Sequence, residues 1–350
     1  MRTYFIMKIL SSPLQLVMCR VASDLGIFEA LMVSKDGIPT DDLAAKTKAD
    51  KILIVRILRY LASYGLIQSP SPHVWASSAL TPFLANPAFA AGLRFGTTCI
   101  LPSAMAIPTL LERNSFQGMS SSDRTAFQIG HSTQDSMFQW LANHPQDQRD
   151  FQKWMGEAQR HQEPIFNVFP LDKFIPEAND GSTPLFVDVG GANGHVCQQI
   201  RAKYPDWNGR VINQDLQAIR VGLDSPSHAI EHQDYDFFTE QPIKGARIYY
   251  LRNILQNWSD AECAQILARV CEAMSHRSVL IIDSAAMADY GTNWHDCYVD
   301  IVMGMFFGAR VRTIEEYKAM AETAGLVWDD AIKYGEGSNQ QIFVLFKRHS

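Results

Sequence analysis

Apolar residues near the start of the chain recur with the spacing of amphipathic helices. Between Leu14 and Ile27, leucine, valine and isoleucine return at roughly three- and four-residue intervals. The stretch KILIVRILRYLASYGLI (51–67) repeats apolar residues in the same way, and Gly65 is predicted to end that helix. Two amphipathic helices are therefore expected in this part of the chain.

The segments around these helices complete a small module. TDDLAAKTKAD (40–50) predicts a short helix with Thr40 as its N-cap. Residues 67–80 predict a short hairpin, or wing. Helix, turn, helix and wing together predict a winged-helix-like module over residues 1–100.

Residues 101–180 read as helices with breaks, rich in Gln, His, Met and Phe. FQKWMGEAQRHQEPIFNVF (151–169) places aromatic residues and Met at helical spacing, which is more often a core pattern than a ligand site. Connectors of this composition also line ligand pockets. We therefore expect a helical connector beside a substrate pocket.

From Pro184 onward, short apolar runs alternate with amphipathic helical stretches. The helical stretches are SDAECAQILARVCEAM and TIEEYKAMAETAGL. The predicted strands are LFVDV (185–189), RVINQDL (210–216), ARIYYLR (246–252), SVLIID (278–283) and QQIFVLF (340–346). This alternation predicts an α/β domain over residues 181–350, with a doubly wound, mostly parallel sheet.

A glycine-rich turn follows the first of these strands. Asp188-Val-Gly190-Gly191-Ala-Asn-Gly194 leads into a helix, and Asp215 closes the next strand, where a carboxylate can accept both hydroxyls of a ribose. Such turns also exist for packing alone. The pattern is D-x-G-x-x-x-G and not the G-x-G-x-x-G of dinucleotide enzymes, so it favours S-adenosylmethionine, which has no pyrophosphate, over a nicotinamide cofactor.

Composition and charge limit the possible partners. The 350 residues include 31 basic and 37 acidic side chains, a net charge of −6. A winged helix with several lysines and arginines is compatible with DNA binding, but the acidic total favours a packing or dimerisation module and no nucleic-acid partner.

The six cysteines are scattered without a C-x-x-C pair, which fits reduced thiols and predicts neither disulfides nor a metal site. Lys8 interrupts the apolar N-terminus, so we do not interpret it as a secretory signal. No run reaches 18 apolar residues, and no membrane span is expected. These features together predict a cytoplasmic protein.

Four segments in combination resemble the plant and fungal small-molecule O-methyltransferase family. They are VDVGGANGH, YPDW, DFFTEQPIKGARIYYLRNILQNWSDAEC and VRTIEEYKAMAETAGL. Members of that family combine an N-terminal winged-helix dimerisation domain with a C-terminal Rossmann-like class I domain that binds S-adenosyl-L-methionine (SAM). The resemblance covers nearly the whole chain and implies a homodimer that acts on a small molecule.

The resemblance also assigns the cofactor site. By position, Gly190, with Gly191 beside it, and Asp215 contact SAM, Asp236 and Phe237 flank its adenine, and Arg252 lies near the cofactor.

The sequence departs from the family where the catalytic base should be. The family motif L-H-D-W-S-D is here LQNWSD (255–260), so Gln256 replaces the histidine. An amide does not titrate in a usable range and cannot remove a proton from a hydroxyl. Of the two acids that frame the histidine in the family, Asp283 is retained by position, and Val311 replaces the acid of the E-R-T motif.

Two interpretations of this loss remain open. One is a true O-methyltransferase that uses another base or an acidic substrate. The other is a relationship to the non-methylating, SAM-dependent pericyclases of fungal 2-pyridone (leporin-type) pathways. Those enzymes dehydrate an alcohol to a quinone methide and guide a Diels–Alder, hetero-Diels–Alder or Alder-ene closure. The resemblance favours the second interpretation, and a Rossmann dehydrogenase ranks last.

Acid–base groups for such chemistry are available elsewhere. By resemblance, His131 in FQIGHSTQ and Asp296 in NWHDCYVD face the substrate pocket, and both are candidate catalytic residues together with His295 and Gln256. His131 could equally be a core or capping histidine. On one helix, His295 and Asp296 are expected to point about 100° apart, whereas Asp296 and Asp300 share a face.

Overall fold

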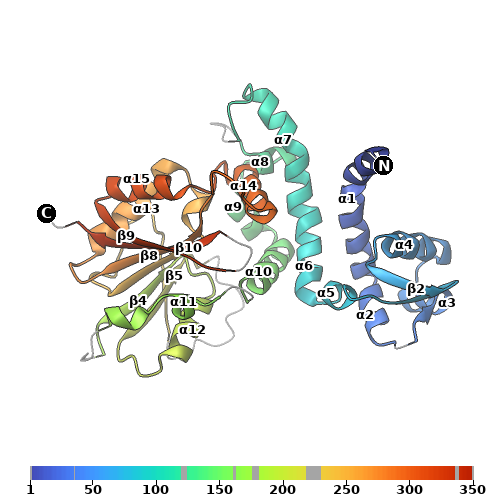
Figure 1. Ribbon diagram of the computed structural model, residues 1–350, viewed down its shortest axis with the longest axis horizontal. Coiled ribbons are helices and arrows are strands. Elements are labelled where there is room, and N and C mark those ends of the chain that lie inside the picture. The colour runs from blue at the N-terminus through green and yellow to red at the C-terminus, as the bar shows by residue number, and fades with distance from the viewer. Residues whose placement is uncertain are drawn as a thin grey trace. The chain divides into compact units, whose positions relative to one another are not determined.

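The computed structural model describes residues 2–34, 36–119, 124–160, 163–175, 181–217, 230–335 and 339–348. The chain forms two compact units (Figure 1). The first comprises Met1–Ala106 and Gly130–His161, and the second comprises Ile107–Ile129 and Gln162–Ser350.

The first unit begins with the predicted helices and wing. Their core combines apolar residues of α1, α2 and α4 with Trp75 of the wing. Gly65, with φ +71°, follows the helix that it was predicted to end. The elements are α1 (Arg2–Asp24), α2 (Ile27–Met32), β1 (Ile38–Pro39), α3 (Thr40–Thr47), α4 (Lys51–Ser63), β2 (Ile67–Ser71) and β3 (Val74–Ser77).

The prediction of Thr40 as an N-cap is wrong. Thr40 is the first residue of α3, and Pro39 precedes it in the capping position without a side-chain hydrogen bond. The Thr40 hydroxyl donates to the carbonyl oxygen of His73 at 3.2 Å and accepts from Trp75 Nε1 at 2.8 Å. Because β1 pairs with β3, this threonine side chain lies against the wing and stabilises it instead of the helix terminus.

A long apolar helical stretch follows, Pro87–Arg113, and by length and composition alone it could cross a membrane. It packs against α1 and α10, and Arg94 within it holds the carboxylate of Asp150, which is 4% exposed, at 2.7 Å. The first part of this stretch, up to Phe95, is therefore packed within the first unit. The elements are α5 (Thr81–Leu84), α6 (Pro87–Phe95), η1 (Gly96–Ile100), α7 (Leu101–Arg113), α8 (Ala126–Gly130), α9 (Met137–Asn143) and α10 (Pro145–Arg160).

The second unit contains the predicted sheet, with strand order β6-β5-β4-β7-β8-β10-β9. The pairs from β6 to β8 are parallel, and β10 pairs antiparallel with both β8 and β9. The strands are β4 (Pro184–Val189), β5 (Arg210–Asp215), β6 (Glu231–Asp234), β7 (Ile248–Arg252), β8 (Val279–Ala285), β9 (Leu326–Lys333) and β10 (Gln340–Lys347).

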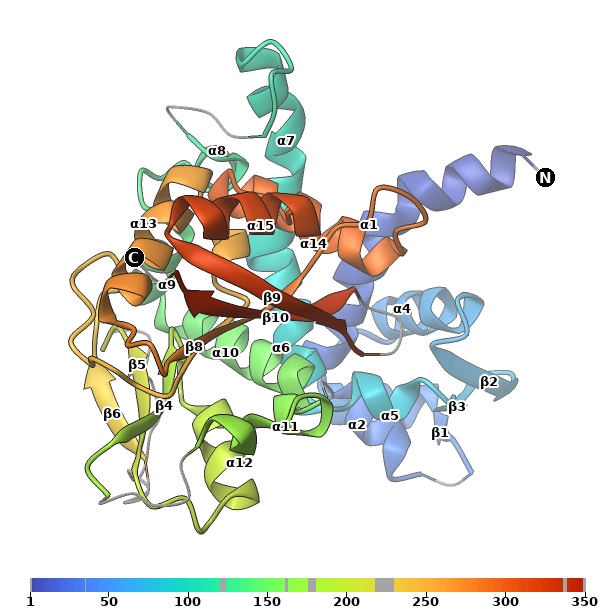
Figure 2. The same cartoon turned by 60° about the vertical axis from the view of Figure 1, so that its left-hand side comes forward.

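Helices cover both faces of this sheet (Figure 2). One face packs against α13 and α15, and the other packs against α11, η2 and α12. The helical elements are α11 (Ile165–Val168), η2 (Leu171–Phe174), α12 (His195–Lys203), η3 (Leu255–Asn257), α13 (Asp260–Ala273), α14 (Trp294–Phe307) and α15 (Ile314–Thr323). The doubly wound, mostly parallel architecture predicted from the sequence is confirmed.

Successive residues of each central strand alternate between the two faces. On β8, Leu280 and Ile282 pack toward α13 and α15, whereas Val279 and Ile281 pack toward the opposite cluster. This alternation decides which side chains near the end of β8 can reach the candidate site.

Two strands of the second unit, β6 and β9, were not predicted from the sequence. Both lie at the edges of the sheet. EHQD is polar throughout, and Asp329 and Asp330 interrupt the apolar residues of LVWDDAIK, as is tolerated in edge strands that are only half covered. A search for continuous apolar runs finds buried central strands and passes over such edges.

Candidate active site

The glycine turn after β4 is closed by backbone hydrogen bonds to the next strand. The amides of Gly190 and Gly191 donate to the carbonyl oxygen of Gln214 at 2.8 and 3.1 Å. Gly190 has φ +78°, and a Cβ added to it would lie 2.5 Å from Ile254 Cδ1. A Cβ on Gly191 would lie 2.2 Å from Asn213 Oδ1. Only glycine fits this turn, because the side chains of Ile254, Asn213 and Asp188 fill the space that a Cβ needs.

Two buried acceptor oxygens face this turn. Asp188 Oδ2 and Asn213 Oδ1 have no hydrogen-bond donor among the residues that the structure describes, and both lie within 2.4 Å of the position of a Cβ on Gly191. Burial raises the pKa of Asp188 from 3.8 to about 7, although the positive charge of Arg252 opposes this shift. Buried acceptors without donors are costly, so this spot is suited to a ligand that brings N–H groups.

Asp215 stands at the end of β5, beside the same turn. Its Oδ2 accepts from the amide of Ala192 at 2.8 Å, and its Oδ1 accepts from the amide of Leu216 at 2.8 Å. The side chain is half-buried, so its carboxylate is fixed in position at the carboxyl edge of the parallel strands. Ligands of doubly wound sheets bind at this edge.

The loop after β6 brings the next candidates to the glycine turn. Phe237 Cε1 would lie 3.7 Å from a Cβ on Gly190, and its ring packs edge-on against Trp258 with the centroids 5.6 Å apart. Asp236 is exposed, and its Oδ1 accepts from the amide of Phe238 at 3.0 Å, which shapes the loop. The structure therefore brings Gly190, Gly191, Asp215 and Phe237 together at one edge.

Arg252, at the end of β7, is paired with a buried carboxylate. Its Nε lies 3.5 Å from Asp283 Oδ2. Asp283 is fully buried and also accepts from the hydroxyl of Tyr250, from the hydroxyl of Tyr334 at 2.6 Å and from Gln340 Nε2 at 2.7 Å. Among the described residues, no hydrogen bond joins Asp283 to Gln256, and the retained acid pairs with Arg252 instead.

Gln256 lies in η3, directly after β7, and is 8% exposed. Its Oε1 lies 3.4 Å from Ser284 Oγ, and Ser284 Oγ lies 3.0 Å from the hydroxyl of Tyr317. Strand alternation explains this arrangement, because Ser284 shares a face with Ile282 whereas Asp283 faces the other way. The place of the family's base is thus surrounded by neutral hydrogen-bonding groups.

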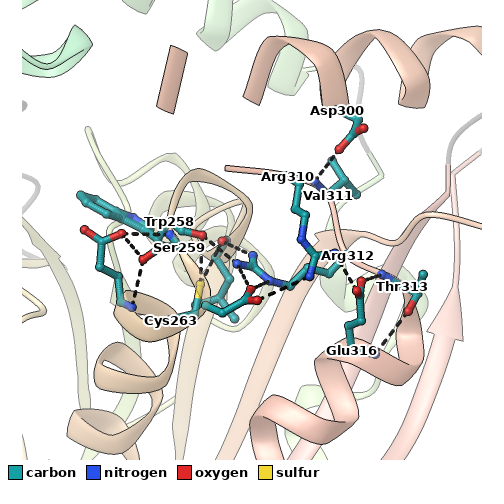
Figure 3. A network of polar contacts seen from close by, with 12 residues as sticks. Trp258, Ser259, Cys263, Asp300, Arg310, Val311, Arg312, Thr313 and Glu316 are labelled. Carbon is teal, nitrogen blue, oxygen red and sulfur yellow. Dashed lines mark hydrogen bonds and ion pairs between the residues drawn. The ribbon is translucent and has the colours of Figure 1, made fainter. Parts of the chain in front are cut away.

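Arg312 fixes the backbone on both sides of Gln256. Its guanidinium donates to the carbonyl oxygens of Leu255 and Trp258, each at 2.7 Å, and to Asp260 Oδ1 at 2.7 and 2.8 Å. Figure 3 shows Arg312 reaching across to Trp258. The arginine is 1% exposed, so the turn that carries Gln256 is held rigidly by charge-assisted hydrogen bonds.

Val311, at the position of the missing acid, is buried and lies directly before this arginine. Its amide donates to Asp300 Oδ1 at 2.8 Å, as Figure 3 also shows. Asp300 therefore binds α14 to the segment that follows it. This contact gives Asp300 a structural role.

Asp296 and His295 lie in the first turn of α14, which Asn293 caps. Asp296 is 3% exposed, and its Oδ2 accepts from Asn293 Nδ2 at 2.6 Å and from the amide of Asn339 at 3.1 Å. His295 Nδ1 lies 3.6 Å from Asp296 Oδ1. The expectation that the two side chains point apart is wrong, because these two atoms lie within ion-pair distance.

His131 belongs to the first unit, whereas the other candidates belong to the second. Its Nε2 lies 3.4 Å from the carbonyl oxygen of Cys99, and its ring packs at 4.8 Å from that of Trp140. Burial lowers the pKa of His131 below 6.5. The ring is therefore neutral near pH 7, a state in which one ring nitrogen carries a hydrogen and the other can accept one.

The sequence analysis missed four residues of this site: Asn213, Ser284, Arg312 and Tyr317. Alternation along β8 would have placed Ser284 on the face of Ile282 and Leu280, both apolar. Asn213, Arg312 and Tyr317 join the site only through contacts between strands and helices that are far apart in the sequence.

Two family models match the chain. A model described as the O-methyltransferase domain matches residues 125–327, and one described as the O-methyltransferase dimerisation domain matches residues 14–86. Together they cover the candidate site in the second unit and the winged-helix-like module in the first.

Known proteins with similar sequences or structures extend this match. The chain is 32% identical to "O-methyltransferase lepI" of Aspergillus flavus over 92% of its length and 83% of that protein. A solved structure of LepI in complex with SAM has a TM-score of 0.89 at 29% identity, covering 99% of this chain and 90% of that one.

Two further matches carry different activities in their descriptions. The chain is 32% identical to the demethylsterigmatocystin 6-O-methyltransferase of Aspergillus flavus, over 92% of its length and 82% of that protein. A solved structure described as "A Pericyclic Reaction enzyme" has a TM-score of 0.89 at 30% identity, covering 98% of this chain and 89% of that one.

Proposed function

The chain belongs to the O-methyltransferase family, and we propose that it is a SAM-binding enzyme that dehydrates and cyclises a small molecule without transferring the methyl group. The cyclisation is pericyclic, of the Diels–Alder, hetero-Diels–Alder or Alder-ene type. The substrate is a polyketide-like or pyridone-like compound of secondary metabolism, which carries an alcohol that is lost as water.

The cofactor is SAM, and the residues of the glycine turn fit it. Asp188 Oδ2 and Asn213 Oδ1 are buried acceptors without described donors, which suits the ammonium group of the cofactor's amino acid end. Asp215 is positioned to accept from ribose hydroxyls, and Phe237 offers an aromatic surface for the adenine. When bound, SAM supplies a fixed sulfonium charge that stabilises negative charge on a nearby oxygen.

One observation carries the proposal: among the residues that the structure describes, neither Gln256 nor the side chains hydrogen-bonded behind it can take up a proton near pH 7. Gln256 is an amide that contacts Ser284, and Val311 is a buried alkyl group at the position of the family's second acid. Burial raises the pKa of Tyr317 to about 12, so this phenol also stays protonated. General-base assistance is worth about 10²- to 10⁴-fold, which methylation of an ordinary phenol would lose.

Dehydration needs a group that moves one proton, and His131 is the candidate. Its neutral ring accepts the proton of an acidic ring hydroxyl while the carbon–oxygen bond of the alcohol breaks. The electron pair of the O–H bond becomes the new carbonyl bond, and the imidazolium returns the proton to the departing hydroxyl, which leaves as water.

Asp296 is the candidate for orienting the substrate. Two donors, Asn293 Nδ2 and the Asn339 amide, hold its Oδ2. Its Oδ1 faces the exposed His295. A carboxylate fixed in this way accepts a hydrogen bond from a substrate hydroxyl and keeps the reacting ends close, as pericyclic closure requires.

The second candidate function is SAM-dependent O-methylation with a non-standard base. The similarity to the demethylsterigmatocystin 6-O-methyltransferase supports it. This alternative requires that another group, such as His131, deprotonate the accepting hydroxyl, or that the substrate be acidic enough to need no base.

We also propose that the chain acts as a homodimer. The dimerisation model matches residues 14–86, and α1 exposes an unusual number of large apolar side chains, among them Ile6, Leu10 and Leu14. Contiguous exposed apolar surface of this kind is typical of subunit interfaces.

Native mass spectrometry of the untreated protein tests the proposed function. The protein is examined before and after incubation with a cell extract that contains the substrate. We expect intact SAM to stay in the site while product forms. Accumulation of S-adenosylhomocysteine in step with product would show that the methyl group leaves and would favour the methyltransferase.

A further inference from the structure

Gln256 has an amide whose two ends have different surroundings. Its Oε1 lies 3.4 Å from Ser284 Oγ. Among the described residues, none accepts a hydrogen bond from Gln256 Nε2, although the side chain is 8% exposed. Nε2 is not among the described buried polar atoms that lack a partner, so its N–H groups reach solvent and are open to an acceptor on a ligand.

The direction of the amide follows from the hydroxyl groups behind it. Tyr317 has a single hydroxyl hydrogen, which can go to Ser284 Oγ at 3.0 Å or to the Ala285 carbonyl oxygen at 3.5 Å. The shorter contact is the stronger one. When Tyr317 donates to Ser284, the serine hydrogen is available for Gln256 Oε1, and the Nε2 group then points away from the serine.

The tyrosine keeps its hydrogen, and the backbone of the turn does not move. Burial raises the pKa of Tyr317 to about 12, so the relay does not reverse through ionisation near pH 7. Arg312 holds the carbonyl oxygens of Leu255 and Trp258 at 2.7 Å. Side chain and backbone of Gln256 are thus both fixed.

The turn lies beside the cofactor edge. Ile254, two residues before Gln256, would meet a Cβ on Gly190, and Leu255 belongs to the buried core under β7 and β8. The turn that carries Gln256 is therefore adjacent to the glycine turn, where the cofactor is proposed to bind.

We propose that Tyr317 and Ser284 are positioning residues that orient the Gln256 amide as a hydrogen-bond donor to an anionic or strongly polarised oxygen of the substrate. This inference rests on the proposed function and deepens it, because it names the acceptor: an enolate-like ring oxygen or a conjugated carbonyl. At the position of the family's base, the protein thus stabilises negative charge instead of removing a proton.

The test uses the SAM-loaded protein with 4-nitrophenol, whose phenolate absorbs visible light, as an oxyanion probe. The pKa of the bound probe is read from its absorbance as a function of pH. An oriented donor favours the phenolate, and a hydrogen bond to a charged group is worth about tenfold or more in affinity. We therefore expect Gln256→Met to raise the pKa of the bound probe by about one unit.

Substitutions of the positioning residues Tyr317 and Ser284 should change the pKa of the bound probe in a distinct way. Tyr317→Phe and Ser284→Ala should each shift the probe's pKa in the direction of Gln256→Met, with SAM affinity unchanged, and the Tyr317→Phe, Ser284→Ala double variant should equal Ser284→Ala alone. Ser284→Thr keeps a hydroxyl and should restore the wild-type value. Tyr249→Phe is the matched control, because Tyr249 is also fully buried and donates to the Ile243 carbonyl oxygen at 2.6 Å, away from Gln256.

The possible outcomes separate this inference from the proposed function. Wild-type protein that binds phenol and phenolate alike, or binds neither, would overturn the inference, as would a Tyr317→Phe variant that matches Tyr249→Phe. An amide turned the other way would favour the neutral phenol. Formation of 4-nitroanisole and S-adenosylhomocysteine would instead contradict the non-methylating function and leave the measured donor effect standing.

Discussion

Two turns at the same edge of the sheet differ in how closely their residues match the family pattern. At the glycine turn, Gly190, Gly191 and Asp215 form a cradle that matches the family pattern, and only glycine fits its tightest point. At the neighbouring turn, Gln256 and Val311 stand where the family has a base and an acid. The first part is suited to bind the cofactor, whereas the second has lost the groups that would use it for methyl transfer.

The backbone beneath the changed part is well supported. Arg312 holds both sides of the Gln256 turn, and a full capping box at Thr313 and Glu316 begins α15 directly after it. The departure from the family pattern therefore lies in a few side chains on a well-supported backbone. This difference teaches that membership of the family predicts the fold and the cofactor more reliably than the reaction.

If position 256 cannot take up a proton, another residue must carry the proton transfer, and His131 is the candidate. We expect His131→Gln to lower turnover by about 10²- to 10⁴-fold, the usual worth of an acid–base group, with SAM still bound. Burial lowers the pKa of His131, so the wild-type rate should fall as the pH drops through a value below 6.5, and the variant should lose this limb.

Turnover of substrate from the cell extract, followed across pH, measures both effects. His276→Gln, at an exposed position, is the control. A His131→Gln variant with an unchanged rate and pH profile would exclude His131 from the chemistry.

Adding a side chain to the glycine turn tests the proposed cofactor site. Gly191→Ala places a Cβ 2.2 Å from Asn213 Oδ1 and 2.4 Å from Asp188 Oδ2. We expect SAM affinity to fall by about 100-fold, toward the upper end of the cost of overpacking. Isothermal titration calorimetry measures the dissociation constant. Gly156→Ala, in α10 with open space around it, should leave it unchanged, and equal affinities in the two variants would contradict the placement of the cofactor.

Asp188 should make the stability of the cofactor-free protein depend on pH. Because burial raises its pKa to about 7, the folded protein without cofactor holds a proton there that the unfolded chain releases above pH 4. Stability should therefore fall as the pH rises, by about 2–3 kcal/mol between pH 5 and 7 for this one group. Asp188→Asn should remove that decline in urea unfolding of the cofactor-free protein. Parallel curves for the two proteins would show that Asp188 is ionised throughout.

We expect Asp215 to contribute less to SAM affinity than the shape of the glycine turn does. Asp215→Asn keeps an acceptor for the amide of Ala192 but loses the charge, and we expect SAM affinity to fall by about tenfold. The comparison is with Asp329→Asn, an exposed position on β9. A dissociation constant unaffected by Asp215→Asn would mean that another residue binds the ribose.

The smallest expected effect is that of a substitution at Gln256 on methyl transfer. Gln256→His alone should not produce methyl transfer, because Ser284 and the buried Val311 offer the new histidine no carboxylate. S-adenosylhomocysteine formation measures the result. Robust methyl transfer by this single variant would show that one side chain separates the two activities and that the supporting acid is dispensable.

Much of the second unit could be predicted from its sequence, because its central strands are buried on both faces and read as apolar runs. The glycine turn was visible for a similar reason, since Gly190 and Gly191 have no alternative there. The edge strands β6 and β9 were missed because their exposed sides are polar.

The candidate site was harder to predict, because its geometry depends on contacts between distant elements. The sequence shows that Gln256 is not a base, but only the register of β8 and the packing of α15 place Ser284 and Tyr317 behind it. His295 and Asp296 illustrate the opposite error. An ideal helix separates their directions, whereas the first turn of α14 brings them to 3.6 Å.

The central claim is that SAM is retained and its methyl group stays in place. The most direct measurement loads the protein with SAM carrying a deuterated methyl group, allows many turnovers on extract containing the substrate, and then analyses protein and product by mass spectrometry. We predict product of lower mass by one water, or of unchanged mass after cyclisation alone, with labelled SAM still intact in the site. Product that carries the deuterated methyl group, formed together with S-adenosylhomocysteine, would contradict the claim.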